Sequence, residues 1–259
     1  MAHEWDAGQY ARFLDARTLP AIDLLSRIAA VAAPGRVVDL GCGPGNSTAI
    51  LKERWPAAAV TGIDSSANLL DAARRDHPTI AFEQGDIAGW APSEKFDVVF
   101  ANASLQWVGD HAHLVPRLFD RVAAGGVLAV QMPRNHDFAT HRLMRQVAAE
   151  APWRDRLAGA REPSPVESPE FYYDLLAPRA AAFTLWETNY IQIMDGVGAI
   201  IAWLHGTGLR PFLARLTEAE RPVFLERYAA LLAEEYKPQA DGKILLPYPR
   251  LFFIATKPR

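Results

Sequence analysis

The 259-residue sequence is poor in several features that define common classes of protein. Its one cysteine, Cys42, excludes an internal disulfide and a metal site built from several cysteines. No apolar run reaches the ~18 residues of a membrane-spanning helix, and the first residues lack the basic and apolar regions of a secretory signal. The net charge of −3 gives no general attraction to the backbone of a nucleic acid. We therefore expect a cytoplasmic protein with no nucleic-acid partner and no membrane partner.

A glycine-rich stretch near the start of the chain is its most informative feature. The mostly apolar segment Val37–Leu40 predicts a buried strand, and a helix is expected from about Ser47 to Arg54. Between them stand Gly41, Gly43 and Gly45. A glycine turn between a strand and a helix brings the backbone close to a ligand at the carboxyl edge of a parallel sheet.

Two phosphate-binding patterns do not fit this turn. A dinucleotide fingerprint needs glycine at the position of Asn46, and a P-loop needs a lysine where the chain from 41 to 50 has no cation. What remains is an acid, Asp39, followed by three glycines at alternate positions. This pattern suits a ligand without phosphate, while an ordinary glycine-rich turn stays the alternative.

Two further acids follow the next two predicted strands. Asp64 ends the strand Ala58–Asp64, and Asp86 follows the strand Thr79–Glu83. Asp64 stands about 20 residues after the glycine turn, the interval at which an acid meets ribose hydroxyls. Three acids at three consecutive strand ends predict a binding site along one edge of the sheet.

The rest of the chain predicts more strands and then a change of character. Strands are expected at Phe96–Ala101 and Val127–Met132, and the first runs into the segment Asn102–Trp107. The composition shifts after Met132. Beyond it the patterns predict helices over 136–157, 169–176, 198–204 and 218–236, and strands over 181–194 and 250–256.

Together these residues resemble motif I and the acidic positions of the Rossmann-like S-adenosylmethionine-dependent methyltransferases. Two later stretches, Trp203–Pro211 and Leu245–Arg250, match as well, so the resemblance spans nearly the whole chain. Within them, Gly206–Pro211 and Pro247–Arg250 narrow the resemblance to the trans-aconitate 2-methyltransferases. It implies an α/β fold with a doubly wound, mostly parallel seven-stranded sheet, an antiparallel last strand, and helical additions over the active-site edge. One methyltransferase domain would cover 1–259, with residues 1–132 mainly binding cofactor beneath an N-terminal lid and residues 133–259 supplying acceptor-binding helices and the last strands.

The resemblance also implies the ligands. The cofactor would be S-adenosylmethionine, with S-adenosylhomocysteine as product and no metal, and the partner would be a small tricarboxylate. The residues expected to bind the cofactor are Asp39, Gly41, Gly43, Gly45, Asp64, Ser65, Asp86, Ile87 and Asn102.

The implied reaction is transfer of a methyl group to one carboxylate of trans-aconitate, giving a monomethyl ester. A carboxylate is ionised at pH 7 and is itself the nucleophile, so we assign no catalytic acid or base. Most residues expected to bind the acceptor are cationic or hydrogen-bonding groups in segments that begin at the active-site edge. They are Tyr10, Trp107, Arg134, His205, Arg210, Tyr248 and Arg250.

Other functions remain open at this point. The segment Leu105–Trp107 also fits methyltransferases that act on the free carboxylate of a malonyl carrier protein. A quinone C-methyltransferase would need a large apolar pocket. A non-catalytic S-adenosylmethionine-binding module would keep the same glycines and acids.

Overall fold

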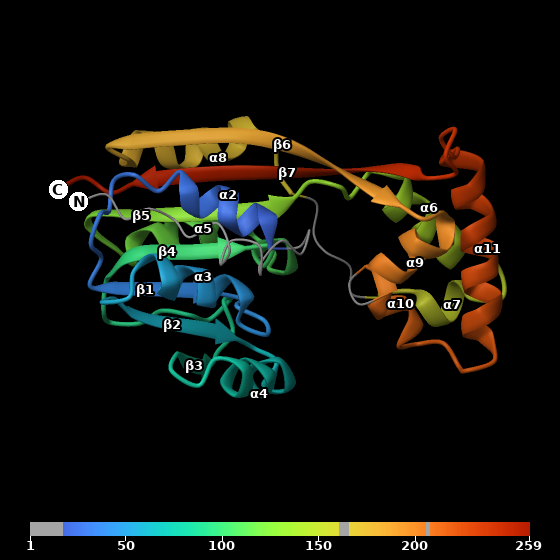
Figure 1. The fold of residues 1–259 in the computed structure, drawn as a ribbon, viewed down its shortest axis with the longest axis horizontal. Helices are drawn as coiled ribbons and strands as arrows, with labels where there is room; N and C mark the ends of the chain where they lie inside the picture. Colours follow the sequence, from blue (N-terminus) through green and yellow to red (C-terminus); the bar gives the residue numbers. More distant parts are fainter. Residues whose placement is uncertain (1–17, 161–165, 206–207) are drawn as a thin grey trace. The chain divides into compact units, whose positions relative to one another are not determined.

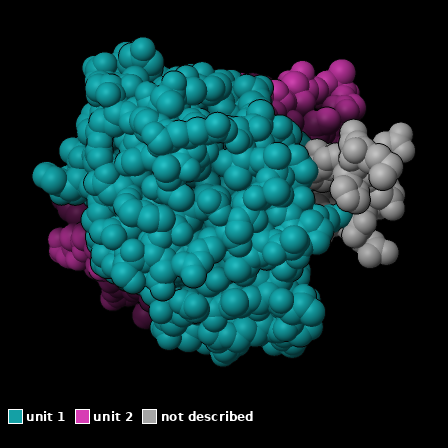
Figure 2. All heavy atoms as spheres, turned by 90° about the vertical axis from the view of Figure 1, so that its left-hand side faces the viewer, with its two compact units in different colours: residues 1–132, 166–188, 250–259 teal, residues 133–165, 189–249 magenta. Residues whose placement is uncertain are grey.

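The computed structural model describes residues 18–160, 166–205 and 208–259. Tyr10 and the expected N-terminal lid lie outside these described residues. The described chain divides into two compact units, which are coloured separately in Figure 2. Unit 1 comprises residues 1–132, 166–188 and 250–259, and unit 2 comprises residues 133–165 and 189–249.

Seven strands form one mixed sheet in the order β3-β2-β1-β4-β5-β7-β6 (Figure 1). Their bounds are β1 Arg36–Leu40, β2 Ala59–Asp64, β3 Ala81–Gln84, β4 Phe96–Asn102, β5 Val122–Pro133, β6 Ala182–Met194 and β7 Ile244–Thr256. The strands β1 to β5 pair in parallel. β7 runs antiparallel to β5, since Lys257 N donates to Gly126 O and Arg134 N donates to Pro249 O. The predicted sheet, including the antiparallel last strand, is therefore confirmed.

Helices cover both faces of the sheet in unit 1 (Figure 1). α2 (Leu19–Ser26) and α3 (Asn46–Arg54) lie on one face, and α4 (Ala67–Asp76) packs beside β3. The other face carries the main apolar core, to which α5 (His111–Asp120) and α8 (Pro169–Leu176) contribute. Short 3₁₀ helices lie at Leu105–Trp107 (η2) and Ala177–Arg179 (η3).

Unit 2 is a helical unit with an apolar core of its own. Its helices are α6 Ala139–Ala148, α7 Arg154–Leu157, α9 Val197–His205, α10 Arg210–Leu213 and α11 Glu220–Glu235. The buried Tyr228 hydroxyl donates to Thr140 O over 2.7 Å and so ties α11 to α6. None of the helices in the described residues is long and apolar enough to cross a membrane.

Three expected elements differ from the observed ones. The helix predicted over 136–157 is two helices, because Pro152 has no N–H with which to continue the first. β5 begins at Val122 rather than Val127, and it passes through Gly125 and Gly126, a residue type common in turns, with Gly125 at φ 76°. β7 begins at Ile244 and includes Pro247 and Pro249, although prolines usually argue against an internal strand.

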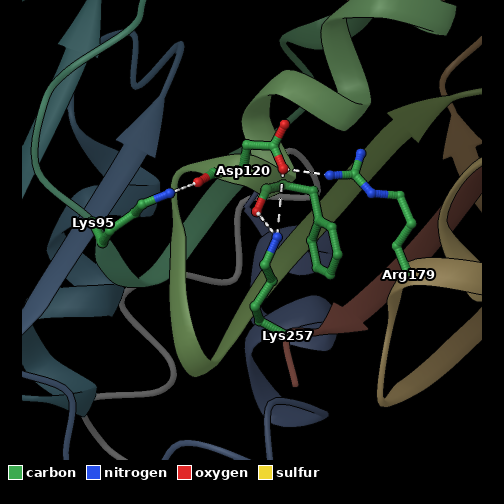
Figure 3. A network of polar contacts seen from close by, with 5 residues as sticks. Lys95, Asp120, Arg179 and Lys257 are labelled. Atoms are coloured by element: carbon green, nitrogen blue, oxygen red, sulfur yellow. Dashed lines mark hydrogen bonds and ion pairs between the residues drawn. The ribbon is translucent and has the colours of Figure 1, made fainter. Parts of the chain in front are cut away.

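Three cationic side chains bind Asp120 in unit 1, near the amino ends of the parallel strands (Figure 3). Lys95 donates to the backbone oxygen of Asp120, where α5 ends. Arg179 and Lys257 both bind the carboxylate of Asp120, and the Lys257 ammonium also lies 4.3 Å from the centre of the Phe119 ring. These residues precede β4, β5 and β6 or follow the antiparallel β7, so they lie at the opposite edge from the glycine turn.

Candidate functional site

The glycine turn follows β1 as predicted, and all three of its glycines have positive φ. The values are 74° at Gly41, 54° at Gly43 and 92° at Gly45, a region that residues with a Cβ adopt only at a cost. The turn is attached to β2, because the backbone N–H groups of Gly41 and Cys42 both donate to Ile63 O, over 2.7 and 3.0 Å.

The three glycines make room for different neighbours. A Cβ on Gly41 would lie 2.3 Å from the Cβ of Ser104, and a Cβ on Gly45 would lie 2.8 Å from the ring of His77. A Cβ on Gly43 would meet no described atom within 4 Å. Gly41 and Gly45 are thus needed for packing within the protein, and Gly43 is the position where the backbone faces open space.

Asp39 is fully buried beneath the turn and holds the start of α3. Its Oδ2 accepts hydrogen bonds from Ser47 Oγ over 2.6 Å and Thr48 Oγ1 over 2.7 Å. Burial raises the pKa of Asp39 to about 6, and the two hydroxyl donors only partly offset this effect. The other oxygen, Oδ1, has no hydrogen-bond partner in the described part of the chain.

Backbone N–H groups orient the carboxylates at the ends of β2 and β3. Asp64 accepts from Gly43 N over 2.9 Å through Oδ2 and from Ser66 N over 2.8 Å through Oδ1. Asp86 is exposed and accepts from Ala88 N over 2.9 Å. These bonds fix the direction of each carboxylate while leaving further lone pairs on its oxygens. Of the neighbouring expected residues, Ser65 is exposed and Ile87 is buried.

The turn after β4 lies against the glycine turn. Ala103 adopts φ 52°, an uncommon conformation for a residue with a Cβ, and its N–H donates to Gln131 O over 2.9 Å. Ser104 Oγ donates to Leu40 O over 2.6 Å, and this bond brings Ser104 against Gly41. Asn102, just before the turn, has an Oδ1 without a hydrogen-bond partner among the described residues.

A buried histidine supports η2, the 3₁₀ turn that contains Trp107. His111 Nε2 lies 2.9 Å from Leu105 O, and His111 Nδ1 lies 2.7 Å from the hydroxyl of Tyr172. A carbonyl oxygen only accepts, so Nε2 carries the proton and the Tyr172 hydroxyl donates to Nδ1. The start of α5 and the middle of α8 therefore hold this turn in place.

The residues expected to bind the acceptor are divided between the two units. Trp107 and Arg250 belong to unit 1, where Arg250 is buried in β7 and Trp107 is half-buried. The remaining described ones belong to unit 2: Arg134 and Tyr248 are half-buried, and His205 and Arg210 are exposed. Tyr248 packs edge-on against Trp203 with 6.0 Å between ring centroids. The role of each residue in acceptor binding stays a prediction.

The site fits S-adenosylmethionine in the chemistry of its groups. Asp39, Asp64 and Asp86 offer acceptors to ammonium and hydroxyl donors, the space at Gly43 admits a ligand, and no cation occurs between 41 and 50 that would select a phosphate. The lone cysteine takes no chemical role here, because burial raises the pKa of the Cys42 thiol and so keeps it protonated.

Sequence reasoning missed several polar residues of this region. Ser104 and His111 hold the turns together, and the buried Gln106 donates to Ala103 O over 2.7 Å. Gln131 lies within β5 and is fully buried. A single amide inside the apolar run Val127–Met132 was a signal that could have identified it, since an amide is costly to bury without a partner.

Comparison with solved structures supports the fold. The YcgJ protein of Bacillus subtilis matches 93% of this chain and 99% of its own with a TM-score of 0.60 at 14% identity. The Haemonchus contortus phosphoethanolamine N-methyltransferase 2, solved with phosphomonomethylethanolamine and S-adenosylhomocysteine, matches 93% of this chain and 53% of its own with a TM-score of 0.56 at 17% identity. At these identities the likeness concerns the fold alone.

The fold and the glycine turn with its acids are those of a class I S-adenosylmethionine-dependent methyltransferase, and a methyltransferase-domain family model matches residues 10–172. Among full-length relatives, the trans-aconitate 2-methyltransferase of Azoarcus sp. strain BH72 is 51% identical over 98% of this chain and 99% of its own. The protein of the same name from Methylobacterium nodulans is 50% identical over 99% of both chains. The chain belongs to the trans-aconitate 2-methyltransferase family.

Proposed function

We propose that the protein transfers a methyl group from S-adenosylmethionine to one carboxylate of trans-aconitate, giving a monomethyl ester and S-adenosylhomocysteine. The observation that carries this proposal is about 50% identity, over almost the full length of both chains, to several proteins named for that activity. The structural likeness alone would support only the fold.

The reaction asks for positioning rather than for acid–base chemistry. The cofactor supplies an electrophilic methyl group on a sulfonium. A carboxylate is ionised near pH 7, so no side chain has to remove a proton from it. The protein has to align the carboxylate oxygen with the methyl group and keep water away, because opposite charges are neutralised in the reaction and a dry site favours this step.

We assign cofactor binding to the residues predicted from the sequence. The carboxylate of Asp64, oriented by Gly43 N and Ser66 N, suits a pair of ribose hydroxyls. Asp86 and Ile87 suit an adenine ring, with one polar and one apolar contact. The buried Asp39 supports the turn through α3, and its free oxygen suits a cationic group nearby. The complete proposed set is Asp39, Gly41, Gly43, Gly45, Asp64, Ser65, Asp86, Ile87 and Asn102.

The acceptor residues are proposed by their chemistry. Arginine matches the two oxygens of a carboxylate with its planar fork, which suits Arg134, Arg210 and Arg250 to the carboxylates that do not react. An arginine on the reacting oxygen would reduce its nucleophilicity. The proposed set is completed by Tyr10, Trp107, His205 and Tyr248.

The test is a panel assay with S-adenosylmethionine labelled in its methyl group. The acceptors are trans-aconitate, cis-aconitate, citrate, a malonyl carrier protein and a quinone precursor. Base-labile label on trans-aconitate is expected, because methyl esters hydrolyse in base. Label on another acceptor would overturn the acceptor assignment, and cofactor binding without any transfer would indicate a binding module. Asp64→Asn serves as a control that should raise the KM for the cofactor more than the KM for trans-aconitate.

A further inference from the structure

Gln131 is a fully buried amide in the middle of the sheet. Its exposed fraction is 0%, and neither Oε1 nor Nε2 has a partner in the part of the chain that the structure describes. A buried amide without partners costs free energy on folding. Its backbone oxygen, in contrast, accepts from Ala103 N at the turn after β4.

The side chain of Gln131 lies on the face of the sheet opposite the main apolar core. Its neighbours along β5, Val130 and Met132, belong to that core, and side chains alternate along a strand. On β4 the residue directly opposite Gln131 is Asn102, which therefore shares its face. The same alternation puts Asp39 of β1 on this face, since Val38 and Leu40 belong to the core.

Arg250 completes this group from the other neighbouring strand. The antiparallel pairing of Gly126 with Lys257 places Phe252 opposite Gln131 and Arg250 one diagonal step away. Leu251 and Phe253 belong to the core, so Arg250 is on the same face as Gln131. All these residues belong to unit 1, and Arg250 is 5% exposed.

The polar groups on this edge change in character from one side of the sheet to the other. Acids lie at or just beyond the carboxyl ends of β1, β2 and β3, where a cationic cofactor is expected. Asn102 ends β4 with a neutral amide, Gln131 adds a second amide two residues before the end of β5, and β7 adds the cation of Arg250. An anionic ligand is therefore favoured at the β4–β5–β7 side and disfavoured beside the acids.

We propose that Gln131 Nε2 donates a hydrogen bond to a carboxylate of the acceptor, next to Asn102 and Arg250. The inference rests on the proposed function and adds a residue that is not among those predicted to bind the acceptor. A neutral amide can orient the reacting carboxylate through its second oxygen and withdraws less negative charge than an arginine does. Gln131 is then a specificity-determining residue, because an acceptor without a carboxylate at this position leaves the amide unpaired.

The test measures binding separately from transfer. Trans-aconitate is titrated calorimetrically into the protein saturated with S-adenosylhomocysteine, so that no methyl group can react. The variants are Gln131→Met, which keeps the volume and removes both polar atoms, and Gln131→Glu, which keeps the shape and replaces the donor with an acceptor. Gln146→Met is the matched control, since Gln146 is exposed on α6.

We expect Gln131→Met to raise the Kd for trans-aconitate about tenfold or more, the range for a lost hydrogen bond to a charged group. Gln131→Glu should raise it further by repulsion. Gln146→Met and the wild type should agree within about twofold, as should the Kd for S-adenosylhomocysteine in all four proteins. The Tm of Gln131→Met should not fall, because the amide has no side-chain hydrogen bond to lose among the described residues.

Three results would overturn the inference, and they differ from one another. An unchanged Kd for trans-aconitate in both Gln131 variants would refute the role of Gln131 and leave the proposed function standing. An equal loss of S-adenosylhomocysteine affinity would assign Gln131 to the cofactor. A wild-type protein that neither binds nor methylates trans-aconitate would refute the proposed function, and the inference would fall with it.

Discussion

Replacing the first two glycines of the turn by alanine should separate folding from cofactor binding. At either position the positive φ of the backbone makes alanine cost about 1–2 kcal/mol of unfolding free energy. A stiffer unfolded chain returns about 0.4–1 kcal/mol of this loss. At Gly43 nothing else opposes the methyl group, because no described atom lies within 4 Å. At Gly41 the methyl group would lie 2.3 Å from the Cβ of Ser104, so Ser104 has to move and its 2.6 Å bond to Leu40 O is strained or lost.

Gly43→Ala should therefore lower the free energy of unfolding by about 1 kcal/mol, and Gly41→Ala by about 3 kcal/mol or more. Urea denaturation measures both. Cofactor affinity, measured by calorimetry with S-adenosylhomocysteine, should fall at least tenfold in Gly43→Ala, where the methyl group enters the space proposed for the ligand. Ser104→Gly should rescue the stability of Gly41→Ala in part, since it removes the colliding atoms. Equal stability losses at the two glycines, or full cofactor affinity in Gly43→Ala, would refute this reasoning.

Three further changes test other parts of unit 1. Burial raises the pKa of Asp39 from 3.8 to about 6, so ionisation of this carboxyl destabilises the fold. Relative to Asp39→Asn, the wild type should lose up to about 3 kcal/mol of unfolding free energy as the pH rises from 4 to 6, and nothing more above pH 6. A difference in urea denaturation that does not change with pH would contradict this. Tyr172→Phe leaves His111 Nδ1 buried without a donor and should cost about 1–3 kcal/mol in the same assay, whereas a loss below about 0.5 kcal/mol would show that the pair is not needed. Asp120→Asn removes half-exposed ion pairs with Arg179 and Lys257 (Figure 3) and should cost less than about 1 kcal/mol, with an unchanged KM for trans-aconitate because it lies at the opposite edge; a changed KM would contradict the placement of the site.

Much of the fold could be predicted because its signals are local. Apolar runs such as Val37–Leu40 and Phe96–Ala101 end in polar or glycine-rich turns, and the alternation of strands and helices implies a parallel sheet. The errors occurred where a local signal is overridden by pairing. Gly125 and Gly126 indicate a turn, yet β5 continues through them because Gly126 O and Lys257 N still pair with each other. Pro247 and Pro249 similarly lie inside β7, where Pro249 O still accepts from Arg134 N although a proline has no N–H to donate.

The sequence allowed the residues of the candidate cofactor site to be predicted, but not the structural role of each residue. The glycines were interpreted as a group that lets a ligand approach the backbone. In the structure Gly41 and Gly45 make room for side chains from β4's turn and α4's end, and only Gly43 faces open space. Likewise Asp39 is held by Ser47 and Thr48, eight and nine residues later. Such contacts between segments depend on how the chain packs, and they cannot be derived from the spacing of residues along the sequence.

The acceptor residues are harder to predict from the sequence because their signal is chemical rather than periodic. Arginine was a natural choice for a tricarboxylate, but the chain has many arginines, and the described ones mostly bind acids or backbone oxygens at the surface, as Arg227 does with Glu150. A neutral amide within an apolar strand carries more information, because burial without a partner has a cost that an exposed arginine does not pay. Gln131 meets that criterion in the structure, and its position opposite Asn102 adds a second polar group on the same face. If the proposed role of Gln131 holds, a buried polar group that lacks a partner among the described residues is a better guide to the acceptor than charge alone.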